Sequence, residues 1–106
     1  MAWVFLGIAG LLEVVWAYAM KLSDGFSRPV ASVVTIVAMI LSFGLLSMAM
    51  RSLPLGTAYT VWTGIGAVGA FIVGIAVLGE ALTVTRVLAA VLIVSGLVLM
   101  KISSPG

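Results

Sequence analysis

The stretch that decides the fold is residues 2–20, AWVFLGIAGLLEVVWAYAM, an apolar run that holds one carboxylate, Glu13, and is followed by Lys21. As an α-helix rising about 1.5 Å per residue, this run spans a bilayer and places Glu13 near the midplane. A charge at that depth costs about 2.5–3.5 kcal/mol on insertion scales, so it persists mainly where function uses it. A structural ion pair is the weaker interpretation, because no other charge lies deep in an apolar run. Glu13 is therefore the leading candidate for a binding site.

The composition indicates that the solvent of this chain is lipid. Of its 106 residues, 64% are hydrophobic and only 8% are charged, which is more apolar surface than a small soluble domain can bury. Three further apolar runs follow at about residues 30–50, 57–78 and 84–100, each close to the ~20 residues that a membrane helix needs. We therefore expect one domain, residues 1–106, made of four transmembrane helices.

Short connections join the four runs, and each carries turn or cap residues. Loops this short force neighbouring helices to run antiparallel, so we expect an up-down-up-down bundle with both termini on one side. A proline suits the first helical turn, a glycine suits the end of a helix, and a threonine can cap a helix N-terminus. The residues concerned are Asp24-Gly25 and Pro29, Pro54 and Gly56, and Gly79 and Thr83.

The ionisable residues and one motif exclude several classes of protein. The net charge of +2 is small and scattered, so we expect no nucleic-acid partner. Without cysteine or histidine the chain offers no disulfide, no thiol chemistry and no metal site of the common kinds, and we expect no cofactor, metal or enzymatic activity. The stretch GIGAVG at residues 64–69 matches a dinucleotide fingerprint, but no strand precedes it and no acidic residue follows at the required distance.

The basic residues do not fix an orientation in the membrane. Either the true helix ends lie two residues away and hide a bias, or the chain inserts in both directions and two copies pair antiparallel. Four helices of this length enclose little polar cavity, which independently favours a dimer. The fourth run has no acid, amide or aromatic residue, so we expect it to serve oligomerisation. One face carries Lys21, Arg28 and Arg86, and the other carries Arg51, Lys101 and the amino terminus.

Three residues of the first two runs are candidates to surround Glu13. Gly10 and Trp16 lie one turn to either side of Glu13 and share its face. Trp16 suits a binding role and a place in the aromatic belt equally well, since it is also about a turn from Lys21. Ser42 lies at the depth of the bilayer centre, although a membrane serine most often bonds to the carbonyl four residues back.

The third run carries a stripe of polar and aromatic side chains. Tyr59, Trp62, Thr63 and Gly66 share one helical face. A phenol, an indole and a hydroxyl inside lipid each need a hydrogen-bond partner, which favours a binding surface, while aromatic packing against the first helix is the alternative. A ridge of small residues on the same run favours close helix packing, and it consists of Gly66, Ala70 and Gly74.

The whole chain resembles the small multidrug resistance family of four-helix bacterial exporters. The resemblance rests on Glu13, on SDGFSR at residues 23–28, on LPLGTAYTVW at residues 53–62 and on the glycine run that follows. Within the family, EVVW at residues 13–16 and WTGIGAVG at residues 62–69 are similar to the guanidinium-exporter subtype, whereas the multidrug subtype usually lacks Trp16. Thr60 stands where alanine is expected for that subtype.

The resemblance implies an antiparallel homodimer of dual topology in the bacterial inner membrane that exchanges cytoplasmic guanidinium for external protons. Guanidinium presents N–H donors that match the geometry of a carboxylate, and two facing Glu13 side chains would titrate as a coupled pair. Proton and cation would then compete for the same oxygens. The implied roles are proton or substrate binding for Glu13, bonding to or orienting Glu13 for Trp16, Ser42 and Trp62, lining the portal and gate for Tyr59, and lining the pocket for Gly10.

Three functions remain open on the sequence. The first is a proton-coupled exporter of guanidinium and small guanidinyl cations. The second is a multidrug exporter of hydrophobic quaternary ammonium cations in exchange for protons. The third is a membrane assembly protein or accessory subunit that transports nothing, and Glu13 without a pairing charge in a spanning helix argues against it.

Overall fold

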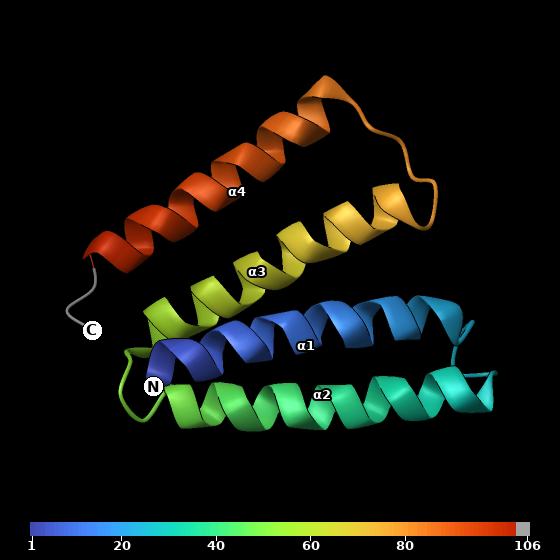
Figure 1. The fold of residues 1–106 in the computed structure, drawn as a ribbon, viewed down its shortest axis with the longest axis horizontal. Coiled ribbons are helices and arrows are strands. Elements are labelled where there is room, and N and C mark those ends of the chain that lie inside the picture. The colour runs from blue at the N-terminus through green and yellow to red at the C-terminus, as the bar shows by residue number, and fades with distance from the viewer. Residues whose placement is uncertain (104–106) are drawn as a thin grey trace.

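The computed structural model describes residues 1–103 and consists of four α-helices joined by short loops. They are α1 (Ala2–Leu22), α2 (Pro29–Ala49), α3 (Leu55–Ala76) and α4 (Val84–Ser103). Each is long and apolar enough to cross a membrane. Figure 1 shows neighbouring helices running in opposite directions, with the start of α1 and the end of α4 at the same end of the molecule. The predicted all-α class with four membrane spans is confirmed, and the helix ends differ from the expected ones by at most three residues.

The turn and cap residues act at the helix ends. Pro29 is the first residue of α2, where its missing N–H is not needed. The Thr83 hydroxyl accepts a hydrogen bond of 3.2 Å from the backbone N–H of Arg86 and so caps α4. Shortly after α3, Gly79 takes a positive φ of 72°, and the N–H of Glu80 donates back to a carbonyl of α3 over 2.9 Å. The loop before α4 therefore folds back onto the end of α3.

The loop between α1 and α2 runs through left-handed backbone. Asp24, Gly25 and Phe26 have positive φ angles of 50°, 74° and 65°. The Ser23 hydroxyl, completely buried, donates to the Met20 carbonyl over 2.7 Å and accepts from the N–H of Phe26 over 3.1 Å. The expected Asp-Gly turn is present, and Ser23 supplies the bonds that hold it.

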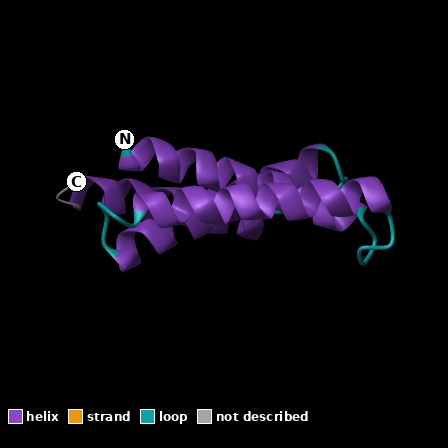
Figure 2. Cartoon of the chain, turned by 90° about the horizontal axis from the view of Figure 1, so that it is seen from below, coloured by secondary structure: helices purple, strands orange, loops and turns teal. Residues whose placement is uncertain are grey.

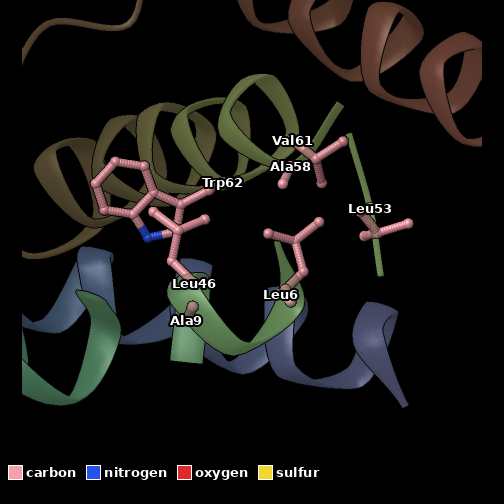
Figure 3. Close-up of a cluster of buried hydrophobic side chains, with 8 residues drawn as sticks. Leu6, Ala9, Leu46, Leu53, Ala58, Val61 and Trp62 are labelled. Atoms are coloured by element: carbon pink, nitrogen blue, oxygen red, sulfur yellow. The ribbon is translucent and has the colours of Figure 1, made fainter. Parts of the chain in front are cut away.

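The core lies where α1, α2 and α3 meet, toward the end that holds the N-terminus. Small residues in the core let the helix backbones approach closely. A Cβ atom on Gly10 of α1, for example, would lie only 2.6 Å from Cγ2 of Ile65 on α3. Figure 3 shows the cluster of buried side chains, which consists of Leu6, Ala9, Leu46, Ala49, Leu53, Ala58, Val61 and Trp62.

Helix α4 lies beside α3, on the side away from α1 and α2 (Figure 1). Its backbone is close to that of α3 and of no other helix, and none of its residues is buried. Leu97 fills the space above Gly64, because a Cβ atom there would lie 2.5 Å from Cδ2 of Leu97. The Lys101 ammonium lies 4.5 Å from the centre of the Trp3 ring, which links the end of α4 to α1.

The chain is thin in one direction. Its extents are 43 × 34 × 16 Å, and Figure 2, turned by 90°, shows the helices gathered in a narrow layer. Such a layer leaves most apolar side chains of α4 exposed on both sides. The expectation that the fourth helix serves oligomerisation stays a prediction.

Candidate functional site

Glu13 lies in the seam between α1 and α3, directly against Gly66. A Cβ atom on Gly66 would lie 2.8 Å from Cγ of Glu13 and closer still to the carboxyl group. The missing side chain of Gly66 therefore makes the space that the carboxyl group occupies. Oε1 of Glu13 is buried and has no hydrogen-bond partner among residues 1–103. A carboxylate oxygen is thus held in an apolar seam with its acceptor capacity unused.

Ser42 makes a bond between helices instead of bonding within its own helix. Its hydroxyl donates to the carbonyl of Ala9 on α1 over 2.7 Å, and it accepts from Nε1 of Trp62 on α3 over 3.0 Å. Ser42 is completely buried, so this pair of bonds ties three helices together. In an α-helix the carbonyl of Ala9 is also the acceptor for the N–H of Glu13. Ser42 therefore fastens the helical turn from which Glu13 projects.

These bonds revise two expectations from the sequence. The usual serine bond to the carbonyl four residues back is not formed at Ser42. Of the two implied roles of Ser42, bonding to Glu13 or orienting it, the direct bond is not formed in the single chain, because the one hydroxyl hydrogen is donated to the Ala9 carbonyl. Trp62 likewise donates to Ser42 and not to Glu13. Both residues can act on Glu13 only through the backbone of α1 in this arrangement.

Trp16 lies close to the site but does not bond to Glu13. Its Nε1 is buried and has no hydrogen-bond partner in the part of the chain that is described. Its ring stands 6.3 Å from the ring of Phe43 on α2, edge to face. A buried indole N–H without an acceptor is uncommon. One face of α1 therefore carries both an unpaired donor, on Trp16, and an unpaired acceptor, on Glu13.

An aromatic row crosses the molecule from α1 to α3. The Phe43 ring lies 5.6 Å from that of Trp62, and the Tyr59 ring lies 5.7 Å from that of Trp62. Tyr59 is 53% exposed, so it stands at the edge of the row. Phe43 was not among the residues predicted for the site, because α2 is apolar on all sides and its sequence does not show which face meets α1 and α3.

One predicted site residue and one residue of the predicted α3 stripe make other contacts in the single chain. Gly10 is buried beneath Ile65, where it permits close packing of α1 and α3, and its expected place in the pocket lining stays a prediction. Thr63 is exposed and lines a cavity of about 480 Å³ between α3 and α4, away from Glu13. The predicted stripe on α3 therefore divides, with Trp62 and Gly66 facing inward.

The chemistry of the site is that of one carboxylate. No group of three or more histidine, cysteine, aspartate or glutamate residues that could hold a metal ion occurs among residues 1–103. The ion pair found within the same range joins Glu80 in the α3–α4 loop to Arg86 in the first turn of α4, so no basic side chain neutralises Glu13. Such a carboxylate can bind a proton or a small cation with N–H donors.

Comparisons with known proteins agree over the full length. The sequence profile of the Small Multidrug Resistance protein family matches residues 1–103. The chain is 56% identical over 104 residues to the "Guanidinium exporter" of Salmonella typhimurium strain LT2, which covers 98% of this chain and 99% of that protein. It is 57% identical over the same length to the "Guanidinium exporter" of Citrobacter freundii, with the same coverage. The similarly named protein of Yersinia pseudotuberculosis is 56% identical, with 98% and 100% covered.

Proposed function

This chain belongs to the Small Multidrug Resistance family, and we propose that it is a transporter that exports guanidinium in exchange for protons. The names of its full-length relatives support guanidinium as the substrate. Its four apolar helices and its bacterial relatives make it a multi-pass protein of the bacterial inner membrane. Guanidinium suits the proposal chemically, because its planar N–H groups pair with both oxygens of a carboxylate.

The observation that carries the proposal is the environment of Glu13. Its carboxyl group lies in the α1–α3 seam against Gly66, with a buried oxygen that accepts no hydrogen bond from the described residues. A buried acceptor left unpaired costs free energy, about 1–3 kcal/mol for a typical group, so a ligand that donates N–H or O–H groups recovers it. Guanidinium donates N–H groups to the carboxylate oxygens, and a proton instead binds to the carboxylate and removes its buried charge.

Competition between these two ligands is enough to couple them. A protonated Glu13 cannot form the charge-assisted pair with guanidinium, and a Glu13 that holds guanidinium resists protonation. If the transporter changes access only when Glu13 is occupied, it carries guanidinium in one direction and protons in the other. Movement of one ligand is then coupled to the opposite movement of the other. The proton gradient thereby drives guanidinium out of the cell.

The proposal includes a second copy of the chain in antiparallel orientation. Two Glu13 carboxylates would then share one site near the bilayer midplane, as in transporters built from inverted repeats. Exchange of conformations between the two subunits would move access from one side of the membrane to the other. The near balance of basic residues on the two faces and the uncovered surface of α4 support this arrangement.

The other site residues have distinct roles in the proposal. Trp16 Nε1, which is buried and unpaired, donates to the loaded Glu13, while Ser42 and Trp62 act through the helical turn that carries it. Tyr59, exposed at the edge of the aromatic row, lines the route to the site. Gly10 acts indirectly, by allowing α1 and α3 to pack closely enough to form the seam.

The test uses purified protein in liposomes with an imposed guanidinium gradient and a pH-sensitive dye inside. We expect proton movement opposite to guanidinium movement, lost in Glu13→Gln, which keeps the shape of the side chain and removes its charge. A response to quaternary ammonium cations without a response to guanidinium would instead support a multidrug exporter. Unchanged exchange in Glu13→Gln would refute the role of Glu13.

A further inference from the structure

The guanidinium group of Arg86 occupies a second site with the features of a guanidinium receptor. Its Nη1 donates to the carbonyl of Ala81 over 2.6 Å, and its Nη2 lies 3.5 Å from Oε1 of Glu80. The centre of the group stands 5.2 Å from the centre of the Phe71 ring. A carbonyl, a carboxylate and an aromatic face are the three kinds of partner that guanidinium groups prefer. The site lies where the α3–α4 loop folds back on α3.

Glu80 lies at one end of the small-residue ridge of α3, and Glu13 lies at the other. A Cβ atom on Gly74 would overlap the carboxyl group of Glu80, as one on Gly66 would overlap that of Glu13. Residues 66 and 74 are separated by about 12 Å along a helix that rises 1.5 Å per residue. The two carboxyl groups therefore lie against one helix, each in the space left by a glycine.

A small cavity occupies the seam between these two positions. It has a volume of about 130 Å³, and its lining reaches from Glu80 and Lys21 at the loop end to Ala70 and Val14 deeper in the seam. Val14 directly follows Glu13 in the chain. A water molecule has a share of about 30 Å³ in the liquid, so the cavity has room for an ion the size of guanidinium.

We propose that Glu80, with the Ala81 carbonyl and the Phe71 ring, is an outer binding site for guanidinium on the way to Glu13, and that the Arg86 side chain occupies it until substrate replaces it. This inference rests on the proposed function, since it names where the substrate binds before reaching Glu13. The contact between Arg86 and Glu80 is long at 3.5 Å, and the two side chains are 40% and 43% exposed. A solvated cation can therefore take the place of the Arg86 guanidinium group beside Glu80.

The charges around the cavity make the outer site a weak one. Lys21 lines the same cavity and opposes a bound cation, while Arg86 competes for Glu80 from the same chain. A tethered competitor acts at an effective concentration of about millimolar, so free guanidinium replaces Arg86 only at comparable concentrations. Removal of Arg86 should therefore tighten binding of guanidinium at Glu80.

The test measures binding of radiolabelled guanidinium to the full-length protein in a Glu13→Gln background, which removes the central site. We expect Glu13→Gln/Arg86→Gln to bind about tenfold more tightly than Glu13→Gln alone, since the tethered competitor is gone. Adding Glu80→Gln should abolish that binding. Glu13→Gln/Lys101→Gln is the matched control, because it removes one positive charge from α4 far from Glu80 and should bind like Glu13→Gln.

Two results would overturn the outer site. One is equal binding with and without Arg86, and the other is binding that survives Glu80→Gln. A second measurement uses Glu80→Gln alone, which keeps Glu13 intact: we expect kcat/KM for guanidinium to fall severalfold with kcat unchanged, and an unchanged kcat/KM would also contradict the site. These results are distinguishable from failure of the proposed function, which would show as absence of exchange by the unaltered chain.

Discussion

Replacing Gly66 by alanine tests whether the space left by this glycine positions the Glu13 carboxyl group in the α1–α3 seam. The added methyl carbon would lie 2.8 Å from Cγ of Glu13, and the carboxyl carbon and Oε1 are nearer still. Ordinary contact begins at 3.4 Å, so the Glu13 side chain must move by at least about 0.6 Å and its carboxyl group by more. The substitution therefore displaces the carboxyl oxygens, the proposed ligands of guanidinium, without changing a charge or a hydrogen-bonding group.

The size of the effect follows from the pairing of guanidinium with a carboxylate. That pair contains two charge-assisted hydrogen bonds, and each bond to a charged group contributes about 1.5–3 kcal/mol. A displacement that breaks one of them predicts a rise of roughly 10- to 100-fold in the apparent KM for guanidinium. The helix itself is not weakened, because alanine is a better helix former than glycine by about 1 kcal/mol.

The assay is guanidinium-driven proton movement in liposomes, with initial rates measured over a range of guanidinium concentrations. Gly44→Ala is the matched control, since it makes the same substitution inside α2 at a position with nothing within 4 Å. We expect the KM of Gly44→Ala to equal that of the unaltered chain. A Gly66→Ala protein that elutes from size-exclusion chromatography at the same volume as the unaltered chain and keeps its KM would refute the idea that Gly66 positions the carboxyl group.

Three further predictions concern the same region. Ser42→Ala leaves the indole N–H of Trp62 without its acceptor, so we expect a loss of about 1–3 kcal/mol in unfolding free energy. In a Trp62→Phe background, which lacks that N–H, Ser42→Ala should cost clearly less than in the unaltered chain. If proton and substrate compete at Glu13, lowering the pH by one unit raises the apparent KM for guanidinium by up to about tenfold, and a pH-independent KM in liposome assays would contradict competition. In Gly64→Ala the added methyl group would contact the Leu97 side chain of the exposed helix α4, which can move aside, so we expect transport close to that of the unaltered chain. A loss as large as in Gly66→Ala would show that α4 is held more firmly than its exposure indicates.

The spans and their ends were predictable because their signals are local. An apolar run of bilayer length is visible without knowing its neighbours, and Pro29, Thr83 and Gly79 act on the backbone within a few residues of themselves. Glu13 could be singled out as the candidate for a binding site for the same reason, since one charge in an apolar run stands out. These features need no information about how the helices are rotated against one another.

The partners of the site residues depend on that rotation and were not predictable. Helix α2 is apolar on all sides, so its sequence carries no periodic pattern to show that Ser42 faces α1 and α3. The same absence concealed the place of Phe43 between two tryptophans. The contact of Glu80 with Gly74 depends on a loop that folds back, which residue spacing along the chain does not specify.

The position of α4 at the edge of the molecule has a consequence for the order in which the protein is made. The Glu13 seat and the bonds of Ser42 involve only α1, α2 and α3, which leave the ribosome first. Helices that insert singly can assemble within the membrane before the chain is complete. The seam that holds Glu13 and the bonds of Ser42 can therefore form while residues 84–103 are still being synthesised. The last helix then packs beside α3 with none of its residues buried, which leaves most of its surface exposed to lipid or, if the predicted dimer forms, to a second chain.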